Sequence, residues 1–209
     1  MERKIGMRLF SILLNSIPQI NQGQLDLGIV DPIISKLSAC IRAAFFLSHG
    51  IRTDTTMYIL VEHENCVIKL VGSELKYLWP DVRSIALLLM KAQMELKLNK
   101  GKSSLSKRGV YINKGSLNLI ETLREININS AQVIFPSLNG KSIEEIMIGV
   151  SVSFIVPVEY PPSEFIVTQL VNQGFKEVFF REIYTIDNFI VMAHNHLDVL
   201  RGNDSDGDN

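Results

Sequence analysis

Residues 45–54 read FFLSHGIRTD and place a serine, a histidine, an arginine and an aspartate within seven positions. They follow an apolar pattern that recurs at i, i+4, i+7 and i+8, which predicts one buried stripe of a helix. The members of that stripe are Leu37, Ile41, Ala44 and Phe45. Gly50 suits the end of such a helix. The stretch therefore predicts a buried helix followed directly by a cluster of polar and charged side chains, which is typical of a functional site.

Strand and helix patterns alternate on either side of this stretch. Apolar and β-branched runs predict strands over residues 7–14, 55–61, 67–71, 132–135, 150–156, 178–180 and 189–193. Apolar periodicity predicts one helix that starts beside Pro80 and further helices over 165–171 and 194–200. Residues 15–28 and 101–107 read as loops. This order predicts an α/β domain with a mainly parallel sheet, whose ligand sites lie at the carboxyl ends of the strands.

The composition indicates one folded domain. A chain of 209 residues with 46% apolar residues can bury a sizeable core, and we expect residues 1–201 to form it. Residues 202–209 are too polar to pack, so we expect a disordered acidic tail. No apolar run reaches the roughly 20 residues that cross a membrane, and we expect a cytoplasmic protein.

The cysteines and histidines predict no metal site. Cys40 and Cys66 are too few for a disulfide framework, and their spacing does not suit zinc. His194 and His196 stand at i and i+2, so a regular helix cannot turn both toward one metal ion. We expect both cysteines to be reduced and structural.

Basic residues gather in one part of a chain whose formal net charge is only −1. Between residues 83 and 108 the only acidic residue is Glu95, and the basic ones are Arg83, Lys91, Lys97, Lys100, Lys102, Lys107 and Arg108. Such a stretch can pair with the phosphates of a nucleic acid. The alternative is a solvated helix face followed by a mobile loop.

Four blocks of the sequence together carry a family resemblance. They are FFLSHGIRTD at 45–54, VGSEL at 71–75, WPDVRSIA at 79–86 and GVYI at 109–112. In this order they resemble the archaeal tRNA pseudouridine-54 N1-methyltransferases, which belong to the SPOUT class. The resemblance extends over about residues 45–198. It implies a SPOUT-like α/β fold with a C-terminal trefoil knot, a homodimer, S-adenosylmethionine as methyl donor, and N1 of a pseudouridine in the TΨC arm of tRNA as acceptor.

The resemblance also implies roles for the charged residues. Methylation at N1 requires a base that removes the N1 proton and a pocket that accepts the nucleobase out of its stack. Asp54 is one candidate base; Asp31 is the second, in a GIVD segment similar to the family's Gly-Arg-Leu-Asp with Ile29 in place of the arginine. The alternative makes Asp54 a turn residue and Arg52 its ion partner. The expected RNA-binding residues are Arg52, Arg83, Lys102, Lys107 and Arg108.

Three segments correspond to the family's cofactor loops. The implied contacts are Pro136, Leu138, Pro157, Glu159, Phe180, Arg181, Ile183, Thr185 and Phe189. After the strand that ends near residue 156, the family has a glycine-rich turn, whereas this chain reads PVEYPP. Each proline removes a backbone donor and fixes φ. Two alternatives to the enzyme follow: a catalytically inactive SPOUT paralogue acting as a dimeric RNA- or protein-binding module, and a structural homodimer whose former pocket is filled by phenylalanines.

Overall fold

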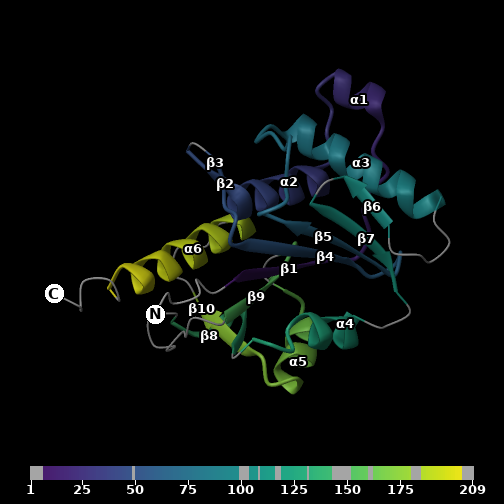
Figure 1. The fold of residues 1–209 in the computed structure, drawn as a ribbon. Helices are drawn as coiled ribbons and strands as arrows, with labels where there is room; N and C mark the ends of the chain where they lie inside the picture. The colour runs from purple at the N-terminus through teal and green to yellow at the C-terminus, as the bar shows by residue number, and fades with distance from the viewer. Residues whose placement is uncertain are drawn as a thin grey trace.

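One eight-stranded sheet forms the centre of the protein (Figure 1). The computed structural model describes residues 7–48, 50–98, 104–107, 109–115, 119–130, 132–142, 152–159, 162–179 and 185–203. In spatial order the strands are β10 (Lys176–Phe179), β8 (Gln132–Ser142), β9 (Val152–Pro157), β1 (Arg8–Leu14), β4 (Thr55–Val61), β5 (Cys66–Val71), β7 (Val110–Lys114) and β6 (Ser104–Lys107).

The sheet is parallel from β10 to β4 and antiparallel from β4 to β6. In the parallel half, Ile12 of β1 pairs with Ile59 of β4 on one side and with Val156 of β9 on the other. The antiparallel half follows from short connections, since residues 62–65 alone join β4 to β5 and so return the chain beside itself. The α/β class is confirmed, with a mixed sheet.

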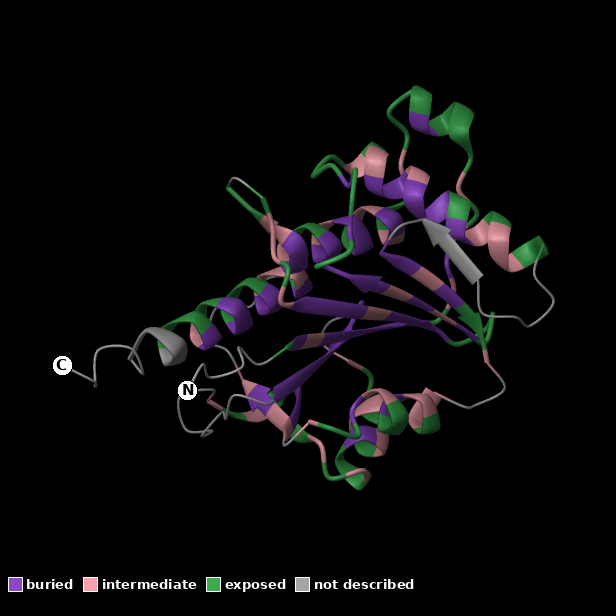
Figure 2. Ribbon diagram, in the orientation of Figure 1, coloured by how far each residue is buried: buried purple, intermediate pink, exposed green. Residues whose placement is uncertain are grey.

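Helices cover both faces of the sheet (Figure 1). On one face lie α1 (Gln22–Asp26), α2 (Pro32–Phe45), α3 (Val82–Leu98) and α6 (Ile186–Asn203). On the other face lie α4 (Leu119–Ile126) and α5 (Glu164–Asn172). Figure 2 shows buried strands between helices whose outer faces are exposed.

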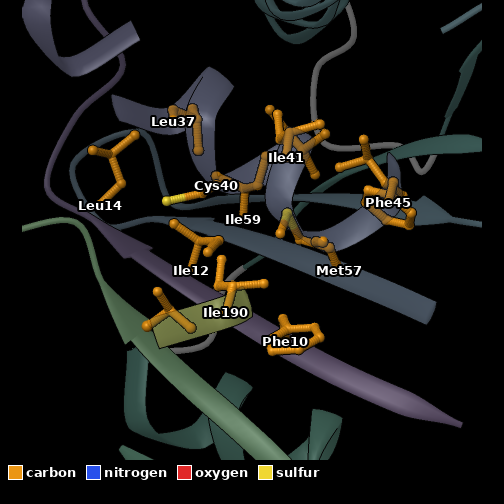
Figure 3. Packing of buried hydrophobic residues seen from close by; sticks show 14 of the residues in the cluster. Phe10, Ile12, Leu14, Leu37, Cys40, Ile41, Phe45, Met57, Ile59 and Ile190 are labelled. Atoms are coloured by element: carbon orange, nitrogen blue, oxygen red, sulfur yellow. The ribbon is translucent and has the colours of Figure 1, made fainter. Parts of the chain in front are cut away.

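The larger core lies between α2, α6 and the middle of the sheet (Figure 3). Leu37, Ile41, Ala44 and Phe45 are all fully buried, which confirms the helical stripe expected from their spacing. In Figure 3, Cys40 lies in the same core, beside Leu37 and above the strand residues. A second core on the opposite face joins α4 and α5 to the sheet. Strands β1 and β4 therefore bury both of their faces, which explains their nearly continuous apolar sequences.

Two expectations about secondary structure are wrong. Residues 189–193 form part of helix α6, and not a strand, because a short apolar run is compatible with either when it is buried. Residues 15–28 are not entirely a loop, since Asn21 caps the short helix α1 by accepting hydrogen bonds from two backbone N–H groups.

Other elements extend beyond their expected bounds. Residues 104–107 of the expected basic loop form β6, which pairs with β7. Helix α4 was not predicted. Helix α6 continues to Asn203, so the first two residues of the expected tail are helical, and residues 204–209 lie outside the described part. Within the part of the chain that the structure describes, no helix is both long and apolar enough to span a membrane.

Candidate functional site

The two candidate bases lie at opposite ends of α2. Asp31 is the N-cap residue of this helix, where its Oδ1 accepts a hydrogen bond from the backbone N–H of Ile33 at 2.8 Å. The short hairpin of β2 (Phe46–Leu47) and β3 (Gly50–Ile51) leaves the other end and leads to Asp54. A helix of 14 residues is about 20 Å long at about 1.5 Å per residue. One protomer therefore cannot bring both carboxylates to the same substrate atom.

Asp54 is held by an arginine that the sequence analysis did not single out. Arg8 is the first residue of β1, and its side chain is only 4% exposed. Its Nε donates to Oδ2 of Asp54 at 2.9 Å, and its Nη2 donates to Asp198 of α6. Arg52 donates to the other oxygen of Asp198 at 3.1 Å. Asp54 therefore lies in a turn, as the alternative to a catalytic role predicted, but the predicted ion partner is wrong. Its partner is Arg8, and Arg52 pairs with Asp198.

His194 completes this cluster as a neutral ring. Its Nδ1 lies 3.0 Å from Nη1 of Arg8, and its Nε2 lies 3.1 Å from the backbone oxygen of Ala44. Since arginine can only donate, Nδ1 accepts and Nε2 carries the hydrogen that is donated to Ala44. Burial, followed by the positive charges of Arg52 and Arg8, lowers the pKa of His194 from 6.5 to about 3. This ring joins α6 to α2 and to β1.

A groove of about 500 Å³ lies beside the cluster, between α2 and α6. Arg52, His194 and Asp198 contribute to its wall together with residues of both helices. Several exposed apolar side chains lie on α6 and on the β2–β3 hairpin: Leu47, Val191, Met192 and Val199. This face of the molecule combines a charged groove with apolar residues that the described chain leaves uncovered.

A second pocket, of about 640 Å³, lies at the carboxyl ends of the parallel strands β1, β4 and β9. Pro157 and Glu159, two of the expected cofactor contacts, are among the residues that line it. The remaining wall is mixed, with apolar and charged groups from both faces of the sheet: Leu13, Leu14, Asn15, Ser16, Ile33, Lys36, Glu62, His63, Leu119, Val158, Pro162, Ser163, Phe165, Ile166 and Gln169. The position of this pocket, at the carboxyl ends of parallel strands, is the one expected for ligand sites in parallel α/β sheets.

The other expected cofactor contacts have different surroundings. Pro136 is buried and Leu138 is exposed on β8, which lies next to β9 in the sheet. Thr185 is exposed just before α6. Phe189 is fully buried in the core, where its ring packs edge-on against Phe154 at 5.9 Å. Phe180, Arg181 and Ile183 lie outside the described residues.

The expected RNA-binding residues are dispersed. Arg83 pairs with Asp26 of α1 at 2.5 Å, and both side chains are about half exposed. Lys107 ends β6, while Lys102 and Arg108 lie outside the described residues. Asp81 caps α3 through a hydrogen bond from the backbone N–H of Ser84 at 2.8 Å. Among the residues that the structure describes, no three His, Cys, Asp or Glu side chains gather as metal ligands.

Comparison with known proteins gives a consistent result. A family described as "Putative SAM-dependent RNA methyltransferase" matches residues 26–201. A tRNA (pseudouridine(54)-N(1))-methyltransferase of Methanococcus maripaludis strain C5 is 31% identical over 180 residues, which cover 78% of this chain and 83% of the relative. The enzyme of the same name from Methanocaldococcus jannaschii is 37% identical over 119 residues, covering 53% and 56% of the two chains.

Several other curated relatives match a shorter part of the chain. The enzyme of the same name from Methanococcus maripaludis strain C6 is 36% identical to this chain over 112 residues. The chain spans about half the length of such relatives, and 54% of this one. Among solved structures, Nep1 from Archaeoglobus fulgidus with bound S-adenosylhomocysteine aligns with a TM-score of 0.62 at 14% identity. The alignment covers 94% of this chain and 99% of that one. The likeness shows a shared fold.

Proposed function

Because the chain belongs to the family of SAM-dependent RNA methyltransferases, we propose that it transfers a methyl group from S-adenosylmethionine to N1 of a pseudouridine in the TΨC arm of tRNA. The observation that carries the proposal is the open pocket beside Pro157 and Glu159. The alternative of a structural homodimer without a ligand required phenylalanines to fill this space. Phe189 instead lies in the core of α6 and is not part of the pocket wall.

The pocket fits the cofactor in size and in charge. Its volume of about 640 Å³ lies within the range of about 300 to 1,000 Å³ that is typical of small-molecule sites. S-Adenosylmethionine has a positive sulfonium, an ammonium and a flat adenine. The carboxylates of Glu62 and Glu159 suit the positive groups, and the ring of Phe165 offers a face for the adenine. When bound, the cofactor supplies an electrophilic methyl group.

Asp31 is the candidate base that this pocket favours. Ile33 and Lys36, in the first turns of α2, line the pocket, and Asp31 directly precedes this helix at the same edge. Its carboxylate is exposed and would accept the proton that N1 of the pseudouridine loses. Asp54, by contrast, is held by the buried guanidinium of Arg8 at the far end of α2. We assign Asp54 a positioning role within the cluster.

The dimer and the knot are part of the same proposal. A homodimer through the groove face would cover the exposed apolar residues of α6 and would set the Arg52 end of one α2 near a second protomer. The similarity of fold to Nep1 supports a SPOUT arrangement, to which we add the trefoil knot at the C-terminal end. tRNA is the proposed partner.

Titration calorimetry with S-adenosylmethionine and S-adenosylhomocysteine tests the cofactor pocket. We expect micromolar binding of both to the wild-type chain, and Glu159→Gln should bind S-adenosylmethionine about tenfold more weakly because a charged contact is worth about 1.5 kcal/mol. Val171→Gln, on the outer face of α5, is the control. Absence of binding at millimolar ligand would favour the non-catalytic binding module.

Single-turnover methylation of tRNA tests the base. Asparagine caps helices as well as aspartate does, so Asp31→Asn keeps the cap of α2 and removes only the proton acceptor. We expect this variant to lose at least about a hundredfold in rate while its melting temperature stays unchanged. If Asp31→Asn methylates like the wild type, Asp31 is not the base, and Asp54→Asn becomes the variant to examine.

A further inference from the structure

Two aromatic side chains are exposed on the connection between β5 and α3. Tyr77 is 79% exposed and Trp79 is 64% exposed, while Leu78 between them is buried. Trp79 is the only tryptophan of the chain. Large aromatic rings contribute most to stability when they are buried, so two of them held in water on either side of a buried leucine require an explanation.

The backbone holds these rings in place. Tyr77 has a φ of +60°, a left-handed conformation that a bulky residue adopts only when its surroundings impose it. Leu75 and Leu78 are buried in the core, and Pro80 and the capping residue Asp81 fix the start of α3. The segment cannot relax without releasing both leucines. Because the segment is already rigid, little conformational entropy is lost when a ligand binds to it.

Two glycines allow this segment to pack closely against its neighbours, because they have no Cβ. A Cβ at Gly109, which has a φ of +79°, would lie 2.6 Å from the backbone nitrogen of Leu75. A Cβ at Gly72 would lie 2.0 Å from the backbone oxygen of Arg52, and the N–H of Gly72 donates to Thr55 at 2.9 Å. The aromatic segment therefore leaves the sheet directly against Arg52, at the edge where the charged cluster lies.

The surroundings of the rings favour a nucleic acid over a protein. The other exposed residues of the segment are polar or proline, so the rings do not continue into an aliphatic patch. The acidic groups are engaged within the protein: Glu74 accepts from the hydroxyl of Tyr111, and Asp81 accepts from Ser84. Lys76 is exposed next to Tyr77 and suits a phosphate.

We propose that Tyr77 and Trp79 form a stacking platform for unpaired bases of the RNA substrate. Every base has a π face, so two rings at a fixed position bind looped-out nucleotides with little regard to sequence, and Lys76 contacts their backbone. The platform selects RNA that carries an unpaired loop and rejects a continuous duplex. This inference rests on the proposed function, since it names the form of RNA that the same protein recognises.

Tryptophan fluorescence tests the platform directly, because Trp79 is the only tryptophan of the chain and is the source of all tryptophan emission. The full chain is titrated with a synthetic RNA stem–loop and, separately, with a blunt RNA duplex of equal length, while the anisotropy of labelled RNA follows binding. We expect the stem–loop to quench the emission in step with its binding. The duplex should leave the emission unchanged at equal occupancy.

Substitutions separate stacking from simple apolar contact. Trp79→Leu and Tyr77→Leu should each bind the stem–loop about tenfold more weakly, and Trp79→Tyr should stay within about twofold of the wild type. Ile128→Ala removes an exposed apolar side chain beyond α4 and should have no effect.

The outcomes distinguish this inference from the proposed function. If the stem–loop binds without quenching and Trp79→Leu binds it like the wild type, the platform is refuted and the methyltransferase proposal stands. If the wild type binds no stem–loop at all, both are refuted. If Trp79→Leu changes self-association in light scattering but not RNA affinity, the rings form a protein contact and the platform is again refuted.

Discussion

Arg8 carries its positive charge almost entirely inside the protein, between Asp54, Asp198 and His194. Arg8→Met removes this charge and leaves two carboxylates without their shared partner. We expect a loss of about 3 kcal/mol in the free energy of unfolding, as for other broken buried ion pairs. Urea denaturation measures it.

Arg83 provides the matched comparison. Its pair with Asp26 is about half exposed, and Arg83→Met should cost less than about 1 kcal/mol because solvent screens such pairs. Equal losses for the two arginine variants would show that the Arg8 cluster contributes no more than a surface ion pair.

His194 makes stability depend on pH. Its pKa is about 3 in the folded protein and 6.5 without the fold, so below pH 6.5 the unfolded chain binds a proton that the folded chain excludes. The contribution of neutral His194 to the free energy of unfolding is complete above pH 6.5. Below this pH it should fall by up to about 1.4 kcal/mol per pH unit. Burial by itself would raise the pKa of Asp198, but hydrogen bonds from Arg8 and Arg52 and their positive charges hold it below its usual 3.8. The stability that this carboxylate adds is therefore complete above pH 3.8 and is lost only on further acidification.

The variant His194→Gln isolates this effect, since glutamine has no proton to gain. Urea denaturation of both proteins between pH 7 and about 4.5 should show a steep decline for the wild type and a shallower one for the variant. Identical slopes in this interval would assign the acid sensitivity to other groups.

At the scale of elements, Gln93 of α3 fastens the segment that leads to α1 and to Asp31. Its Nε2 donates to the backbone oxygens of Ile17 at 3.1 Å and Pro18 at 2.9 Å, and its Oε1 accepts from the N–H of Ile20 at 3.3 Å. Gln93→Leu should cost about 2 kcal/mol through these lost bonds. Hydrogen exchange should accelerate over residues 15–31 and leave α5 unchanged.

The exposed Lys91, two residues before Gln93 on the same helix, supplies the control. Lys91→Leu should leave exchange over residues 15–31 at the wild-type rate. A Gln93→Leu protein with wild-type exchange would mean that the apolar contacts of Ile17 and Leu25 alone hold this segment against the core.

At the scale of the whole molecule, the face between α2 and α6 decides the state of association. Val191 is 52% exposed on α6 beside the groove, and a charge there would be buried in the proposed dimer. Light scattering should give a dimeric mass for the wild type and a monomeric mass for Val191→Glu, because burying an unpaired carboxylate costs several kcal/mol. Val171→Glu, on α5 of the opposite face, should remain dimeric; a monomeric wild type contradicts the dimer.

Local sequence patterns were sufficient to predict much of the secondary structure and the family to which the chain belongs. The apolar stripe of α2 and the strands near residues 7–14 and 55–61 follow from spacing and side-chain type, because each pattern depends only on residues close together in the chain. The four sequence blocks were likewise sufficient for the family, which the match over residues 26–201 confirms.

The tertiary structure alone decided how the charged residues are used. Asp31 and Asp54 are both candidate bases in the sequence, but the length of α2 separates them. Asp54 is held by Arg8, which also binds Asp198, 190 positions away from it in the chain. Residues 189–193 become helical because α6 packs against α2, and an apolar run specifies burial without specifying periodicity. Contacts between residues distant in the chain have no signature in local spacing, and for this reason the pocket and the charged cluster emerged only from the fold.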